Sequence, residues 1–207
     1  MAIDRKKIIN NLSKVEVRGN EEGLIPAFNV LITQLPTEFW NKFAVKITDA
    51  VSDDLKEAAW GLLYNAANEC GYHTGYGIIT SEEWKAVVEP MVEKVPEDIL
   101  HGAYAAFTAW GWANAEIVEL VPHEKMVVRA YDYYEADVNK EGNSPIVMAP
   151  MITGVSSAFM DLAYSEPYPN GFGRFICKQT KGIECGDDYG EFVVTKNDPD
   201  VEFTFLS

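Results

Sequence analysis

The sequence predicts an α+β fold, in which helices and antiparallel strands occupy separate stretches of the chain. Up to residue 112, apolar side chains recur mainly at helical spacing. From 113 to 136 they alternate as in two strands joined by a short turn. One more helical stretch and a second pair of strand-like segments follow, with no Pro/Gly/Ser-rich linker between them. We therefore expect one domain preceded by a short N-terminal segment.

The chain begins with a mixed, polar segment, residues 1–25, which we interpret as a short helix or strand followed by a turn. The single domain is expected over 26–207. A strand is predicted at 25–32 from its β-branched and aromatic residues, and a helix from Pro36. One face of that helix carries Phe39, Trp40 and Phe43.

Three more helices are predicted in the first half of the chain. Ser52 is a good N-cap for the longest of them, and Gly71 is a natural stop. Thr80 and Glu83 have the spacing of a capping box, which opens the next helix. Pro96 fits the first position of another helix.

The second half of the chain is predicted to contain two hairpins with a helix between them. The segment 122–124, which connects the first two predicted strands, is short enough to be a hairpin loop. Small and apolar residues at helical spacing indicate a buried helix at 146–164. The predicted strands are 113–121, 125–136, 172–180 and 189–196, with a further strand at 201–205.

Composition excludes several classes of protein. Of 207 residues, 47% are hydrophobic and 12% aromatic, which is too apolar for a disordered chain. The formal net charge is −15, so binding of nucleic acid through a basic face and binding to an anionic membrane surface are both disfavoured. The longest apolar stretch, 145–152, is far shorter than the roughly 20 residues that a membrane span needs.

Cysteine usage indicates a reducing compartment. The three cysteines do not form a disulfide framework, and the first residues show no apolar signal-peptide region. We therefore expect a cytoplasmic protein, in which thiols are packing residues, metal ligands or reactive groups.

Four segments, in this order, resemble the 4-vinyl reductase domain family. They are LYNAANECGY at 63–72, the Trp-Gly-Trp junction and strand at 110–118, TGVSSAF at 153–159, and Cys177 followed after seven residues by Cys185. The resemblance implies a twisted antiparallel sheet of about four strands covered by helices, in a protein that is often a homodimer through its N-terminal region. It also implies a small-molecule-binding module. The family includes sensor domains for aromatic compounds and a protein of bacteriochlorophyll synthesis, and related stand-alone proteins include hydrolases of small heterocycles.

Several family members hold a zinc ion beside an apolar pocket, so the resemblance suggests zinc at Cys177 and Cys185. The family pattern also has a Glu three residues before the first of these cysteines and a Cys at the start of the second helix. Here Arg174 stands in the first position, and residues 148–151 contain no Cys. A structural zinc site needs four ligands, and two of the expected ones are absent.

The first functional hypothesis is the binding of a small apolar or aromatic molecule in an enclosed pocket, by a carrier, sensor or accessory protein. Such pockets are built mainly from aromatic and aliphatic side chains. The candidate ligand-binding residues are Trp110, Trp112, Tyr131 and Phe159. The alternative for these side chains is a packed core or an amphipathic strand.

The second hypothesis is a cysteine- or metal-dependent hydrolase or lyase that acts on a small ring compound. Cys177, Cys185 or Cys70 would be the nucleophile or a metal ligand, and His73, three residues after Cys70, would be a base. The alternative is that these are packed thiols and a surface histidine. The sequence contains no phosphate-binding glycine-rich loop and no G-x-S-x-G motif.

Overall fold

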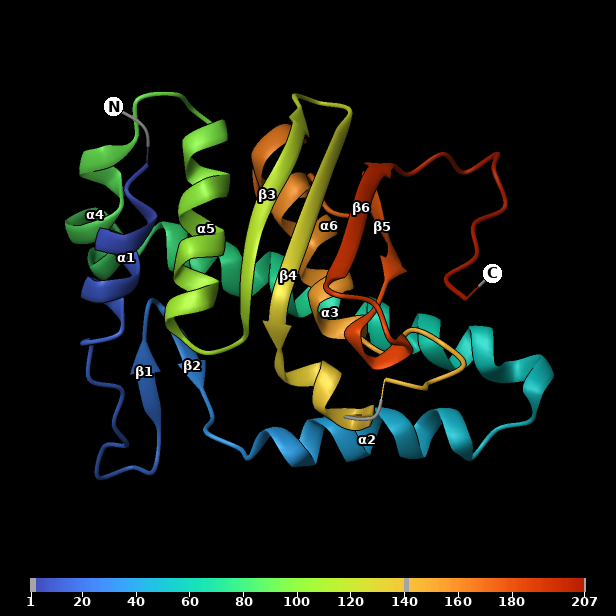
Figure 1. Cartoon of the computed structure of the whole chain (residues 1–207). Coiled ribbons are helices and arrows are strands. Elements are labelled where there is room, and N and C mark those ends of the chain that lie inside the picture. Colours follow the sequence, from blue (N-terminus) through green and yellow to red (C-terminus); the bar gives the residue numbers. More distant parts are fainter. Residues whose placement is uncertain (1–2, 140–141, 207) are drawn as a thin grey trace.

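The computed structural model describes residues 3–139 and 142–206, and its fold is α+β as predicted (Figure 1). One antiparallel sheet has the strand order β3-β4-β6-β5. Its strands are β3 (Ala113–Val121), β4 (Lys125–Tyr133), β5 (Phe175–Lys181) and β6 (Gly190–Lys196). The alternation of the sequence therefore predicts the two hairpins correctly.

The register of the sheet directs one set of side chains to the helices. Met126 of β4 and Cys177 of β5 both pair with Val194 of β6, and all three are fully buried. Successive side chains of a strand point to opposite faces. The residues that flank these positions consequently point to the opposite face of the sheet.

Helices cover one face of the sheet (Figure 1). Helix α6 (Pro150–Tyr164) packs on β5 and β6, and the long helix α3 (Lys56–Ile79) packs along α6. Helix α5 (Glu97–Ala109) lies beside β3, and α1 (Arg5–Leu12) packs against the other side of α5.

The remaining elements lie at the periphery of this helical layer. Strands β1 (Ile25–Ala27) and β2 (Val30–Ile32) form a separate hairpin, and α2 (Thr37–Asp49) and α4 (Glu82–Val87) follow it in the chain. Short 3₁₀ turns are η1 (Asp53–Leu55), η2 (Glu89–Met91), η3 (Tyr134–Asn139) and η4 (Ile183–Cys185). The predicted division of the chain at residue 25 stays a prediction.

The prediction that Gly71 ends its helix is wrong, because α3 continues to Ile79. Gly71 is a packing residue: a Cβ there would stand 3.0 Å from the Cα of Val155 in α6. The cap of α4 is also one residue later than predicted. Ser81 accepts the N–H of Trp84, whereas Thr80 ends α3.

Three predicted strand segments differ from the structure. The predicted single strand at 25–32 is a tight hairpin, because the chain reverses at Phe28 and Asn29 between β1 and β2. The strand at 125–136 ends at Tyr133, and the chain continues as η3. The segment 201–205 forms no strand. Phe205 instead packs on Trp60, with 4.7 Å between ring centroids, and its N–H donates to the carboxylate of Glu57. Aromatic packing of the tail thus replaces strand pairing.

Among the residues that the structure describes, the core consists of two clusters. The larger one lies between the sheet, α3 and α6, and includes Tyr64, Phe107 and Phe192. The smaller one lies between α1, α4 and α5, and includes Phe28 and Trp84.

Candidate ligand-binding site

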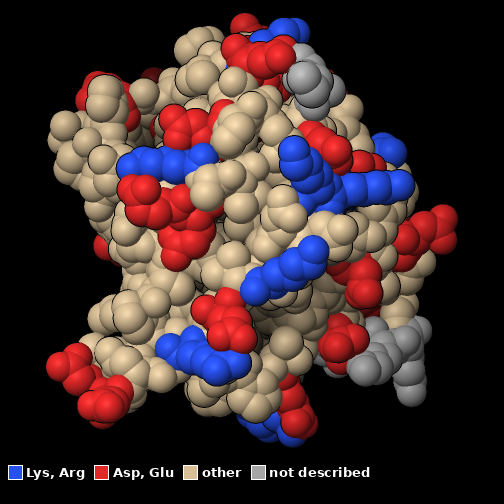
Figure 2. Space-filling view, turned by 90° about the vertical axis from the view of Figure 1, so that its left-hand side faces the viewer, with Lys and Arg blue, Asp and Glu red and all other residues tan. Residues whose placement is uncertain are grey.

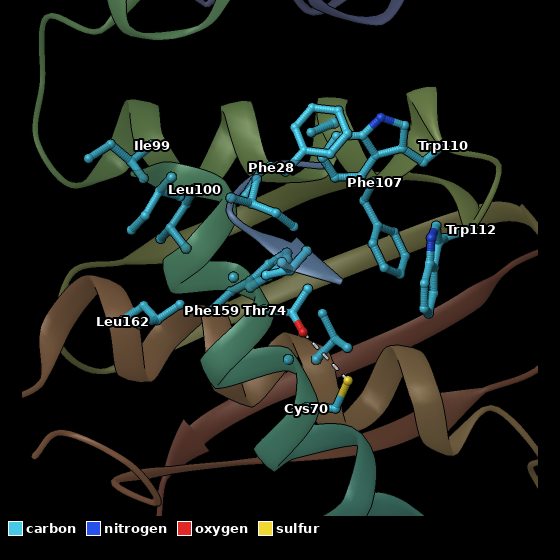
Figure 3. Close-up of a pocket in the computed structure, with 18 of the residues that line it drawn as sticks. Phe28, Cys70, Thr74, Ile99, Leu100, Phe107, Trp110, Trp112, Phe159 and Leu162 are labelled. Carbon is cyan, nitrogen blue, oxygen red and sulfur yellow. Dashed lines mark hydrogen bonds between the residues drawn. The ribbon is translucent and has the colours of Figure 1, made fainter. Parts of the chain in front are cut away.

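A pocket of about 440 Å³ lies between α3, α5, α6 and the β1–β2 hairpin (Figure 3). Phe28 of the smaller core cluster and Phe107 of the larger one both line it, so the pocket lies where the two clusters meet. Its volume falls in the range of small-molecule sites in proteins, about 300–1,000 Å³.

Aromatic rings form one side of the pocket. The ring centroid of Phe107 is 5.4 Å from that of Trp112 and 6.4 Å from that of Phe159, and Phe28 lies 4.4 Å from Trp110. Gly111, with φ of +76°, lets the chain turn sharply between the two tryptophans. A backbone hydrogen bond from Trp112 N–H to the Phe107 carbonyl holds this turn.

Three of the four predicted ligand-binding residues line the pocket: Trp110, Trp112 and Phe159. Tyr131 lies elsewhere. It follows the buried Ala130 on β4 and therefore points to the other face of the sheet. Its side chain is 46% exposed, and its hydroxyl donates to Glu116.

Aliphatic side chains form much of the remaining wall, including Ile78, Ile99, Leu100 and Leu162. Polar groups are few. Cys70 and Thr74 line the pocket from one face of α3, with 3.7 Å between Sγ and Oγ1. The indole nitrogen of Trp110 is buried without a hydrogen-bond partner among the described residues. The pocket therefore offers apolar contacts and few hydrogen bonds.

Sequence reasoning missed the contributions of the hairpin and of α3 to this wall. Phe28 is directed inward by a turn in which both Phe28 and Asn29 have positive φ, 53° and 57°. On α3, the spacing of four between Cys70 and Thr74, and between Gly71 and Gly75, is the signal that these residues share one helical face.

Cys177 and Cys185 are poorly suited to bind a metal. Burial raises the pKa of the Cys177 thiol well above its usual value. Burial, and then the charges of Glu184 and Asp187, raise the pKa of Cys185 to about 11. Zinc binds the thiolate. Within residues 3–139 and 142–206, no group of three or more His, Cys, Asp or Glu side chains could hold an ion. The donor set does not fit zinc, and the prediction of zinc remains untested.

Cys70 and His73 do not form a paired nucleophile and base. His73 Nδ1 lies 2.9 Å from the hydroxyl of Tyr168, whereas the polar neighbour of Cys70 is Thr74. Cys70 is exposed, and Cys177 is fully buried. Of the candidate catalytic cysteines, only Cys70 is a wall residue of the pocket.

A buried carboxylate connects the β5–β6 hairpin with the start of α6. Glu184 accepts hydrogen bonds from the Tyr133 hydroxyl, from Gln179 Nε2 at 2.8 Å and from the N–H of Met148 at 2.8 Å. Burial and then the charge of Glu184 raise the pKa of Tyr133, so its hydroxyl stays protonated as the donor.

Two more buried acidic side chains hold the two ends of α6. Glu135 accepts the N–H groups of Met151 at 2.9 Å and Ile152 at 3.1 Å. Asp161 accepts the N–H of Phe175 at 2.9 Å and those of the two residues before it at 2.8 Å. Burial raises the pKa of Glu135 to about 8 and that of Asp161 to about 6. These contacts position the helix that supplies Phe159 to the pocket.

Charged side chains of both signs lie side by side on the surface that carries α1 and α4 (Figure 2). On the face shown, Lys and Arg alternate with Asp and Glu and form no continuous basic area. This agrees with the net charge of −15. Among the described helices, none combines the length and the apolar character needed to cross a bilayer.

No protein family model and no curated protein matches this sequence. Solved structures share its fold. The phenol-responsive sensory domain of the transcription activator PoxR, crystallised with phenol, superimposes with a TM-score of 0.64 at 14% identity, over 95% of this chain and 92% of that chain. Subunit 3 of a trafficking protein particle complex from Naegleria fowleri, covalently bound to palmitic acid, superimposes with a TM-score of 0.52 at 12% identity. The match covers 78% of this chain and 95% of that chain.

A vinyl-4-reductase family protein from Methanocaldococcus jannaschii gives a TM-score of 0.45 at 16% identity, over 94% of this chain and 92% of that chain. At 14% and 12% identity, the similarities to the PoxR domain and to the Naegleria subunit show the fold alone. The chain is thus an α+β protein with the architecture of the PoxR sensory domain, and it has a pocket lined mainly by apolar side chains.

Proposed function

We propose that this protein binds a small, uncharged, largely apolar molecule in the pocket between α3, α5, α6 and the β1–β2 hairpin. The proposal rests on the pocket itself, which has a volume of about 440 Å³ and walls of aromatic and aliphatic side chains. A charged ligand would lose its hydration there without gaining an ionic partner. An apolar ligand gains free energy in proportion to the area that it buries.

Aromatic rings and acyl chains both belong to this class of ligand. The PoxR sensory domain was crystallised with phenol, and the Naegleria protein holds palmitic acid. The shared fold supports a comparable role here, as a carrier, sensor or accessory protein. The order of motifs along the chain supports divergent membership of the 4-vinyl reductase family.

Isothermal titration calorimetry with matched ligand pairs tests the proposal. The pairs are benzyl alcohol with benzoate and 1-octanol with octanoate, which differ mainly in charge. We expect each alcohol to bind at least about tenfold more tightly than its carboxylate. Equal affinity within each pair, or no binding of either alcohol, would contradict the proposal.

Two variants locate the site. Ala103 lines the pocket from α5, so Ala103→Phe fills it and should abolish binding of the alcohols. The matched control is Tyr131→Phe, on the opposite face of the sheet, which should leave binding unchanged. Loss of binding in both variants, or in neither, would place the ligand elsewhere.

We also propose that two copies associate through α2. Phe39, Trp40 and Phe43 are 51%, 39% and 46% exposed and contact one another on one side of this helix. The other side is attached to the domain, where Asn41 donates to the carbonyl of Tyr134 at 2.8 Å. Exposed aromatic clusters of this kind are typical of interfaces.

A further inference from the structure

The position of Cys70 gives the pocket a chemical property beyond reversible binding. Its side chain is exposed to solvent and is also part of the pocket wall. In Figure 3 the sulfur lies well apart from Ile99 and Trp110 of the facing helix and loop, with Phe107, Phe159 and Thr74 in the space between. A group attached to this sulfur could extend along apolar wall.

We propose that Cys70 is the attachment site of a fatty acyl group, which is held as a thioester and occupies the pocket. This inference rests on the proposed function and names one ligand class for the same pocket. The other two cysteines are unsuited, because Cys177 is fully buried and Cys185 does not line the pocket. The Thr74 hydroxyl, 3.7 Å from the sulfur, can donate to the carbonyl of the thioester.

The chemistry is an exchange between thioesters, and the acyl donor is an acyl-coenzyme A. The Cys70 thiolate attacks the carbonyl carbon of the donor, a new carbon–sulfur bond forms, and the bond to the coenzyme A sulfur breaks. The departing thiolate takes up the proton that Cys70 has lost. Neither sulfur is oxidised or reduced.

Burial of the acyl chain in the pocket determines the direction of this exchange. The bond formed and the bond broken are both thioesters, so the reaction itself has little preference. Each methylene group that moves from water into the pocket favours the acylated protein about fourfold. A long chain should therefore accumulate on Cys70, whereas an acetyl group, which buries almost nothing, should not.

Intact mass spectrometry of the full chain with palmitoyl-coenzyme A tests this inference. We expect one palmitoyl group per chain, removed by neutral hydroxylamine and absent from Cys70→Ser. The matched control, Cys185→Ser, removes a thiol outside the pocket and should be acylated like the wild type. Acetyl-coenzyme A at the same concentration should give at least about tenfold less adduct.

A variant with a filled pocket distinguishes acylation that depends on the pocket from acylation that depends only on the reactivity of the Cys70 thiol. Ala103→Phe keeps Cys70 and should lose palmitoylation while retaining the low level of acetylation. Equal acylation by both donors, or palmitoylation that survives Ala103→Phe, would overturn the inference. If no adduct forms although 1-octanol binds to the wild type and to Cys70→Ser, the inference fails and the proposed function stands. If neither 1-octanol nor benzyl alcohol binds, both fail.

Discussion

Gly154 of α6 lies directly against Tyr64 of α3: a Cβ on Gly154 would stand 2.6 Å from the Tyr64 carbonyl oxygen. It would also stand 2.6 Å from the backbone nitrogen of Asn68. Real Cβ atoms are not found so close to backbone atoms, which cannot move aside as a flexible side chain can. The close contact of these two helices therefore depends on glycine at this position.

Gly154→Ala should force α3 and α6 apart. We expect a loss of about 1–3 kcal/mol in the free energy of unfolding, the usual cost of overpacking, measured by chemical denaturation. Gly19→Ala is the control, because the nearest atom to its Cβ is 4.0 Å away. The control should change stability by less than about 0.5 kcal/mol. A Gly154→Ala protein as stable as the control would show that the helices can separate without cost.

Tyr133 and Tyr131 lie on the same strand, and the same substitution should affect them differently. Tyr133→Phe removes a donor to the buried Glu184 and the acceptor of the Ile183 N–H. We expect it to cost about 1–3 kcal/mol in the free energy of unfolding. Tyr131→Phe removes only a hydrogen bond to Glu116 at the surface and should cost less than about 0.5 kcal/mol. Equal losses would contradict the role assigned to the Glu184 contacts.

Glu135 should make the protein less stable as pH rises. Burial raises its pKa to about 8 in the folded protein, from 4.5. The folded state therefore holds a proton that the unfolded state releases between these values. Its contribution to stability is complete below pH 4.5 and is lost as pH rises through about 8. One such group gives a slope of up to about 1.4 kcal/mol per pH unit.

Denaturation of Glu135→Gln across this range measures that contribution. The pH dependence between about pH 5 and about pH 8 should become flatter than in the wild type, because Gln carries no titrating proton. Asp161, with a pKa raised to about 6, should retain its smaller part of the slope below that pH. An unchanged slope in Glu135→Gln would mean that Glu135 is already ionised in the folded state.

Substitution on α2 tests the association of two copies. Phe43→Glu places a charge in the exposed aromatic cluster, and sedimentation should then show a monomer under conditions where the wild type is a dimer. Leu62→Glu is the control, at an exposed position on α3 that is 69% accessible, and it should stay dimeric. A wild type that is monomeric at all concentrations would contradict the proposal directly.

The strands of the sheet could be predicted closely because alternation and hairpin turns are local patterns, whereas the pairing of β4 with β6 is not. The predicted strand at 113–121 coincides with β3, since alternation and the flanking turn define both of its ends. Helix ends were harder to predict. Glycine is both a common stop signal and a common contact residue, and Gly71 serves as a contact with Val155, which lies far along the chain.

The pocket could be predicted only in part. Trp110, Trp112 and Phe159 are predicted because pocket walls are commonly aromatic, and they do line the pocket. Tyr131 is predicted as a strand residue whose hydroxyl could bond a ligand, but its position on the outer face depends on the register of β4. The contribution of Phe28 could not be predicted, because it depends on how the β1–β2 hairpin docks on α3. Such contacts are decided by tertiary packing rather than by local pattern.

Crystallisation of the protein with 4-bromophenol, a small and largely apolar ligand, shows whether the pocket between α3, α5 and α6 takes up such a molecule. The anomalous signal of bromine locates the ligand without reference to any other density. We expect one strong bromine peak inside the pocket, in van der Waals contact with Phe107 or Phe159. A pocket filled by its own side chains, or bromine only on the outer surface, would contradict the account.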